Sequence, residues 1–133
     1  MIAEYTKSYI DRLYEAKDVS TLFDVISVVG RHRTLPEEFS LFLRLWNWCC
    51  MTRSGIWQYY EGVHADDFES MALTLERFGL LELAHRYRSG MATWKEPESC
   101  TELDAWIDGH WQEVEATAFG LIARSRDSLY AQS

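Results

Sequence analysis

The stretch PEEFSLFLRLWNWCCM, residues 36–51, decides the fold that the sequence predicts. Its proline and two glutamates are favourable in the first turn of a helix. On a helical wheel only one narrow arc of this stretch is polar, and it consists of Glu37, Ser40, Arg44 and Asn47. Because a helix that is apolar nearly all round is normally buried, we expect this one at the centre of the fold.

Helical spacing of apolar residues recurs on both sides of this segment. Before this segment we expect a helix over 3–17 and a second one from a cap at Ser20 to Gly30. After it we expect a helix from a capping box at Asp66 and Glu69 to Gly79, a shorter helix to about Ser89, and a last helical region from 101 onward. Glycines at 109 and 120 weaken that last region, so we expect a break near one of them. The sequence therefore predicts a single all-α domain over 1–133, a compact bundle of about six to eight helices around the apolar helix 36–51.

Composition excludes several classes of protein. The chain has 133 residues and three cysteines, too few for a disulfide framework, and no apolar run approaches the ~18 residues of a membrane span. The N-terminal segment is charged throughout and does not resemble a signal peptide. We therefore expect a cytoplasmic protein with reduced thiols and no membrane partner.

The net charge of −8 is concentrated in one segment. Residues 96–115 contain seven acids and no Lys or Arg, whereas the other 14 acids face 13 bases. Nucleic-acid binding needs a basic surface, so direct binding of nucleic acid is not expected.

Two Glu-x-x-His pairs, Glu61/His64 and Glu82/His85, have the spacing with which helical bundles hold two metal ions. Such a site needs two further glutamates from other helices, and the pairs are only 21 residues apart, so we expect no metal and no cofactor. Cys49 and Cys50 fall on the buried helix, and Cys100 is expected to be more exposed among carboxylates that raise its pKa. No catalytic residue is predicted.

The acidic segment offers the strongest candidate site. If residues 101–115 form one helix, Asp104, Asp108 and Glu115 share one row beside the apolar stripe, and Glu102 and Glu113 share a second row on its opposite edge. Such rows of carboxylates resemble a phosphate backbone and would fit a basic protein partner. The alternative is a solvated face that only keeps the protein soluble. In either case the acids lie off the apolar stripe, so we expect folding to tolerate their replacement.

The stretch SGIWQYYEG, residues 54–62, and the helix after it resemble the core signature of the bacterial DNA-mimic-protein-like family, much of which is known only as a domain of unknown function. The matching residues are Gly55, Gln58, Tyr59, Tyr60, Ala72, Leu75, Gly79 and Ala84, followed by Leu103, Asp104 and Trp106. The departures are Ser54, Ile56 and Glu61. The similarity covers roughly 50–125 and implies an acidic all-α protein, for which mimicry of DNA toward a DNA-binding protein has been proposed within the family. From the residues themselves, Tyr59 and Tyr60 are predicted to anchor a short helix in the core.

Three functions remain open at this stage. The first is a non-enzymatic acidic protein that engages a basic partner, either a DNA-binding regulator or a toxin, in the second case as an immunity-type inhibitor. The second is a structural or self-associating module, a possible homodimer through partly exposed tryptophans such as Trp94 or Trp111. The third is a metal-dependent helical-bundle enzyme.

Overall fold

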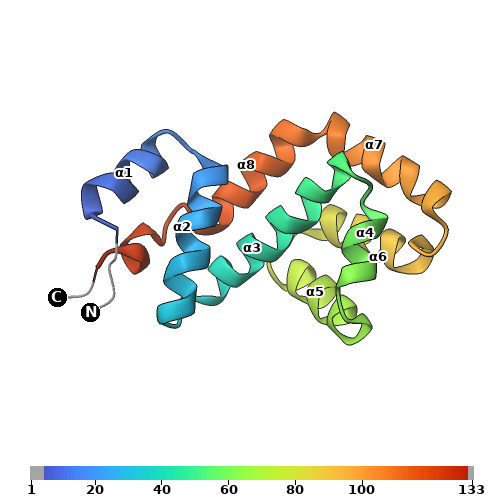
Figure 1. The fold of residues 1–133 in the computed structure, drawn as a ribbon, viewed down its shortest axis with the longest axis horizontal. Coiled ribbons are helices and arrows are strands. Elements are labelled where there is room, and N and C mark those ends of the chain that lie inside the picture. Colours follow the sequence, from blue (N-terminus) through green and yellow to red (C-terminus); the bar gives the residue numbers. More distant parts are fainter. Residues whose placement is uncertain (1–4, 132–133) are drawn as a thin grey trace. The chain divides into compact units, whose positions relative to one another are not determined.

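The protein is all-α (Figure 1). The computed structural model describes residues 5–131, apart from the side chains of residues 97 and 99. Within this part of the chain there are eight α-helices, three short 3-10 helices and no strand, which confirms the predicted fold class. The α-helices are α1 (Lys7–Glu15), α2 (Val19–His32), α3 (Glu37–Cys50), α4 (Trp57–Gly62), α5 (Ala65–Arg77), α6 (Leu81–Thr93), α7 (Thr101–Gly109) and α8 (Trp111–Ile122), and the 3-10 helices are η1 (Met51–Arg53), η2 (Pro97–Cys100) and η3 (Arg126–Leu129).

The chain divides into two compact units. The terminal unit contains Met1–Trp46 and Glu115–Ser133, and the middle unit contains Asn47–Val114. Helices α3 and α8 have residues in both. The single domain expected over 1–133 stays a prediction.

The burial predicted for the segment 36–51 is confirmed by α3. Seven of its apolar side chains are at most 5% exposed, namely Phe39, Leu41, Phe42, Leu45, Trp46, Trp48 and Cys49. Of the four residues of the polar arc, Glu37, Ser40 and Asn47 are exposed and Arg44 is partly exposed. The wheel therefore placed both faces of this helix correctly.

Hydrogen bonds join the two ends of the chain within the terminal unit. The Tyr14 hydroxyl donates to the carbonyl of Ile122 at 3.0 Å, although 108 residues separate them. In addition, the Arg33 guanidinium donates to the carbonyls of Ser128 at 2.6 Å and Tyr130 at 2.9 Å. Helix α1 packs against both α2 and η3. The segment after α8 is thus an integral part of this unit.

A cluster of buried aromatic side chains forms the core of the middle unit. The Trp48 indole donates to the Tyr60 hydroxyl at 3.0 Å, and that hydroxyl donates to the Tyr87 carbonyl at 2.8 Å. The hydroxyls of Tyr59 and Tyr87 are 2.9 Å apart and share a hydrogen bond. Because burial raises the pKa of Tyr60, its hydroxyl stays protonated and keeps its role as a donor. The prediction that Tyr59 and Tyr60 anchor a short helix is confirmed, since they belong to α4 and are 4% and 0% exposed.

Gly55 sets the entry to α4. Its φ of +107° lies in a region that residues with a side chain rarely adopt, and a Cβ added there would lie 2.6 Å from the Trp57 indole nitrogen. The next residue, Ile56, is fully buried. The apolar residues of 54–62 therefore pack a tight turn and one short helix onto the core.

Several helix boundaries differ from the sequence-based expectation. Helix α2 is capped by Asp18 instead of Ser20, because the Asp18 carboxylate accepts hydrogen bonds from the Thr21 amide at 3.1 Å and the Thr21 hydroxyl at 2.9 Å. It continues past Gly30 to His32. Helix α5 is capped by His64 instead of Asp66, and α6 extends to Thr93. The caps of α2 and α5, Asp18 and His64, are thus polar side chains two residues before the expected ones.

Candidate functional site

The turn between α7 and α8 builds the candidate site. The His110 amide donates to the Trp106 carbonyl at 3.0 Å, and Nδ1 of the His110 ring lies 2.7 Å from the same oxygen. The rings of these two residues stack with centroids 4.4 Å apart, and the Arg86 guanidinium lies 4.6 Å from the Trp106 ring centroid. The break expected near Gly109 or Gly120 is therefore found near Gly109, whereas α8 continues through Gly120, and it is fixed by a stack of three side chains.

A hollow opens at this turn. It has a volume of about 410 Å³ and is lined by residues 108–113, which include Asp108, Trp111 and Glu113. A smaller hollow of about 170 Å³ lies between Asp108, Trp111, Thr52 and Arg53. Asp108 and Glu113 are both exposed. We call the larger of the two the acidic hollow.

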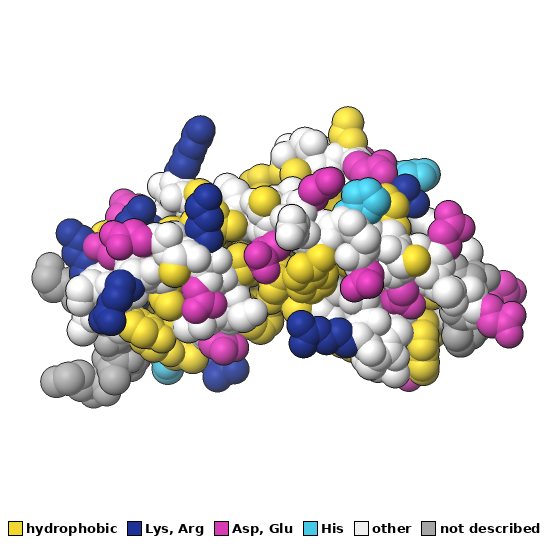
Figure 2. Space-filling model, turned by 90° about the horizontal axis from the view of Figure 1, so that it is seen from above, with side chains coloured by type: hydrophobic (Ala, Val, Ile, Leu, Met, Phe, Trp, Pro, Cys, Tyr) yellow, Lys and Arg dark blue, Asp and Glu magenta, His cyan; other side chains and the backbone are white. Residues whose placement is uncertain are grey.

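Within residues 5–131 no salt bridge engages the carboxylates of the acidic hollow, and Arg53 lines the smaller hollow together with Asp108. Among residues 5–131, neither Asp108 nor Glu113 has a salt bridge or a side-chain hydrogen bond. Figure 2 shows several acidic side chains and few Lys or Arg side chains on the visible face around α7. A cation entering the hollow would meet two carboxylates in a site that Trp111 also lines.

The charge excess of the protein belongs to the middle unit. This unit has twelve Asp and Glu against five Lys and Arg, whereas the terminal unit has nine against eight. Among these bases, Arg88 pairs with Glu69 at 2.8 Å and Glu76 at 3.0 Å, and Arg86 pairs with Glu82 at 3.2 Å. The remaining acids of this unit therefore dominate its field.

The five acids singled out from the sequence do not form two rows. Because α7 ends at Gly109, the wheel drawn over 101–115 as one helix is wrong, and Glu115 belongs to the terminal unit. Asp108 and Glu113, which the wheel assigned to different rows, line the same hollow. Glu102 is exposed in the first turn of α7, where an acid is favourable to the helix dipole. No sequence pattern indicated that Trp111 would lie between two acids; the break at Gly109 was the only available signal.

Asp104 has a structural role that the sequence did not predict. It is half-buried, and its carboxylate accepts a hydrogen bond of 2.9 Å from the amide of Ile56, the residue that precedes α4. Burial raises the pKa of Asp104, and the hydrogen bond from Ile56 opposes that shift in part. This carboxylate holds the entry to α4 onto α7, so it is not a freely replaceable surface acid.

We expect Asp104→Ala to lower the free energy of unfolding by about 1–3 kcal/mol near neutral pH, because the buried Ile56 amide loses its acceptor. Asp104→Asn keeps an acceptor and removes the charge, so its cost should be smaller.

The raised pKa means that the folded state binds the proton of Asp104 more tightly than the unfolded chain does. The stability of the wild type relative to Asp104→Asn should therefore fall as the pH rises from the ordinary value of 3.8 through the folded pKa. Denaturant unfolding of the three proteins over this range measures both effects; an Ala variant as stable as the wild type would contradict the role of the hydrogen bond.

One member of each Glu-x-x-His pair serves another contact. His64 caps α5 by accepting a hydrogen bond from the Asp66 amide at 3.2 Å, and Glu82 pairs with Arg86. Nowhere among the described residues do three His, Cys, Asp or Glu side chains come together as metal ligands would.

The three thiols are shielded from ionisation. Burial raises the pKa values of Cys49 and Cys50, the first strongly. Cys100 is fully buried, which corrects the expectation that it is more exposed, and its pKa is raised by burial first and by Asp104 second. Because the thiolate is the reactive form, none of these cysteines is activated as a nucleophile.

Comparison of the chain with protein-family models, curated proteins and solved structures gives no match. The similarity of 50–125 to the DNA-mimic-protein-like family therefore rests on the residues quoted above and stays a prediction. Within the described part of the chain, no helix combines the length and the apolar character needed to cross a bilayer.

Proposed function

We propose that this protein is a non-enzymatic acidic binding protein that engages a basic protein through the middle unit, with the acidic hollow as the main contact. The observation that carries the proposal is the pair of exposed carboxylates, Asp108 and Glu113, that line one hollow with Trp111 and form no salt bridge among residues 5–131. A Lys or Arg side chain fits this chemistry. Its charge would be neutralised by two carboxylates.

The partner we propose is a DNA-binding regulator or a basic toxin. A partner whose natural ligand is nucleic acid already has a basic surface, and the charge excess of the middle unit is complementary to it. The similarity to the DNA-mimic-protein-like family supports the same choice. The raised pKa values of the thiols argue against nucleophilic catalysis by cysteine.

Self-association is the second candidate. Leu73 and Leu81, both in the middle unit, are large apolar side chains that are 52% and 66% exposed. Association through them would leave the acids only as solubilising groups. Sedimentation of the Leu73→Ser, Leu81→Ser variant against the wild type distinguishes this candidate, because only a leucine-mediated dimer would dissociate.

The test of the main proposal compares two double charge reversals. Once a basic partner has been isolated, we expect Asp108→Lys, Glu113→Lys to weaken its binding on the order of tenfold or more, since attraction becomes repulsion at the contact. The matched control is Glu15→Lys, Asp24→Lys, which makes the same charge change at exposed positions of the terminal unit. Titration calorimetry at two salt concentrations measures both, and the wild-type affinity should fall as salt rises because exposed charges are screened over about 8–10 Å at physiological ionic strength.

Two further outcomes decide between the candidates. If the partner is a DNA-binding regulator, duplex DNA should displace this protein from it; a partner that DNA does not displace is of the toxin class. If both double variants lose affinity equally, the binding depends on the net charge of the protein alone and not on the acidic hollow. A partner that binds the Asp108→Lys, Glu113→Lys variant as tightly as the wild type would overturn the proposal.

A further inference from the structure

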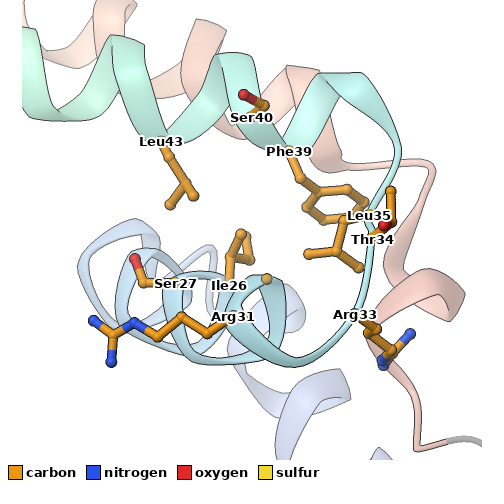
Figure 3. Close-up of a pocket in the computed structure, with 10 residues that line it drawn as sticks. Ile26, Ser27, Arg31, Arg33, Thr34, Leu35, Phe39, Ser40 and Leu43 are labelled. Atoms are coloured by element: carbon orange, nitrogen blue, oxygen red, sulfur yellow. The ribbon is translucent and has the colours of Figure 1, made fainter.

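Accessible apolar surface is concentrated on the hairpin of α5 and α6. The cavity between α2 and the start of α3 (Figure 3) is lined by Ile26 and Phe39, but these are 0% and 1% exposed and already pack within the protein. On the hairpin, in contrast, Leu73 and Leu81 are 52% and 66% exposed. No other large apolar side chain among residues 5–131 is exposed. These two leucines are therefore the apolar surface that a partner could cover.

The two leucines share one face of the hairpin. On α5, Leu73 lies one turn after Glu69 and nearly one turn before Glu76, so these three side chains are neighbours. On α6, Leu81 lies two turns before Arg88 and is on the same side of the helix. The Arg88 guanidinium joins the two helices at this face, since it pairs with Glu69 at 2.8 Å and with Glu76 at 3.0 Å. Both leucines thus lie on the face that carries this salt-bridge network.

This face is held in place by the turn between the two helices. The Gly79 amide donates to the Glu76 carbonyl at 2.9 Å, and the Leu80 amide donates to the Leu75 carbonyl at 2.9 Å. Gly79 has a φ of +79°, which glycine adopts without strain. The two helices also pack against each other. A preformed surface loses little conformational freedom on binding, which suits it to docking.

A chain of side-chain contacts connects this face to the acidic hollow. Glu82 directly follows Leu81 and pairs with Arg86 at 3.2 Å. The Arg86 guanidinium lies over the Trp106 ring, and that ring stacks on His110, which lines the hollow. All these residues belong to the middle unit and are at least partly exposed. The leucines and the acidic hollow therefore belong to one continuous surface.

The charge around the leucines favours a basic partner over a second copy of this chain. Helices α5 and α6 have five acids against three bases. Glu69 and Glu76 share the single guanidinium of Arg88, so their network keeps a negative charge, and Glu69 is 55% exposed. Arg77 lies over the Phe78 ring, 5.7 Å from its centroid. A second copy would bring one acidic unit against another, whereas Lys or Arg side chains would be attracted.

We propose that Leu73 and Leu81 form the apolar docking site for an amphipathic segment of the same basic partner, a role that rests on the proposed function. The segment that fits this face has leucine-like side chains on one side and Lys or Arg beside them. Its apolar side chains cover the two leucines, and its bases lie near Glu69 and Glu82. Removal of the leucines from water stabilises the complex, and the charges select the partner.

The experiment titrates the full chain with a synthetic helical peptide of about four turns, built from leucines at i, i+3, i+4 and i+7 with lysine elsewhere. The matched control for charge has the same leucines and glutamate in place of lysine. Amide shifts in ¹H–¹⁵N NMR spectra locate and quantify the binding. We expect the lysine peptide to shift the amides of residues 69–88 in a saturable manner, and the glutamate peptide to bind at least about tenfold more weakly.

Two double variants test the role of the leucines. Leu73→Ser, Leu81→Ser should weaken binding of the lysine peptide on the order of tenfold or more, because less apolar surface leaves water. Leu73→Met, Leu81→Met is the matched control, since it keeps large apolar side chains at both positions and should keep the binding. Both positions are exposed, so the fold should survive either change, and circular dichroism melts check that it does.

The outcomes separate this docking site from the proposed function. Equal affinity of the wild type and the double serine variant for the lysine peptide would overturn the docking site. If Asp108→Lys, Glu113→Lys still weakened that peptide, the proposed function would stand without it; if neither double variant changed the affinity, both would fail. Equal binding of the glutamate peptide would overturn the choice of a basic partner. A wild-type dimer that the double serine variant dissociates would assign the leucines to a second copy and overturn the proposal.

Discussion

Gly90→Ala is expected to lower the free energy of unfolding by at least about 3 kcal/mol, at the upper end of the usual effect of overpacking a core. Gly90 is buried in α6, and a Cβ there would overlap the hydroxyl and ring carbons of Tyr60. Tyr60 has no room to move aside, because its hydroxyl is held by the Trp48 indole and by the Tyr87 carbonyl. Denaturant unfolding followed by circular dichroism measures the loss; an insoluble Ala variant would agree with the same cause.

The control for this prediction is Gly109→Ala. Gly109 is also a helical residue of the middle unit, but nothing lies within 4 Å of a Cβ placed on it. Alanine is intrinsically better than glycine in a helix by about 1 kcal/mol, so this variant should be as stable as the wild type or slightly more stable. If Gly90→Ala followed the same intrinsic preference and gained stability, the close packing of Tyr60 against α6 would be wrong.

Trp48→Ala is expected to cost about 3–5 kcal/mol, the range for removing a large aromatic side chain from a core. Trp48 is fully buried, its ring centroid lies 5.5 Å from that of Tyr87, and its indole donates to Tyr60. The substitution therefore leaves a cavity and removes the donor to a buried hydroxyl. Chemical denaturation at equilibrium gives the size of the loss.

Trp94→Ala is the matched control, because Trp94 is partly exposed at the end of α6 in the same unit. Its replacement should cost less than about 1 kcal/mol, as is usual away from the core. Similar losses for the two tryptophans would contradict the assignment of Trp48 to the centre of the aromatic cluster.

The sequence was sufficient for the fold class and for the most apolar helix. Apart from Glu38 in the first turn, the polar residues of 36–51 all lie on one arc, and burial along a single helix is enough to produce this pattern. Burial of Tyr59 and Tyr60 followed for the same reason. Helix starts were less predictable, because two polar residues lie close together at each start. At α2 these are Asp18 and Ser20, at α5 they are His64 and Asp66, and local geometry decides which of the two caps the helix.

The candidate site could be predicted only in part. Asp108 and Glu113 were identified as acids of one charged segment, but their meeting at a hollow depends on the turn at Gly109–His110, which is fixed by the stack of Arg86, Trp106 and His110. Arg86 comes from α6, so no wheel of the C-terminal segment could include it. The hydrogen bond between Asp104 and Ile56 joins residues 48 positions apart, so the sequence could not predict it either.

Two glycines that pack against aromatic rings, Gly55 and Gly90, limit which substitutions this chain can accept during evolution. Every codon change that replaces Gly55 brings a side chain against the Trp57 indole at a φ of +107°, and every one that replaces Gly90 brings a side chain against Tyr60. Substitutions at either position should be removed by selection even when they are chemically mild, whereas exposed glycines such as Gly109 and Gly120 are open to change. A distant descendant of this protein would then be recognised more reliably by glycines at these two places, each with its aromatic neighbour, than by its acids.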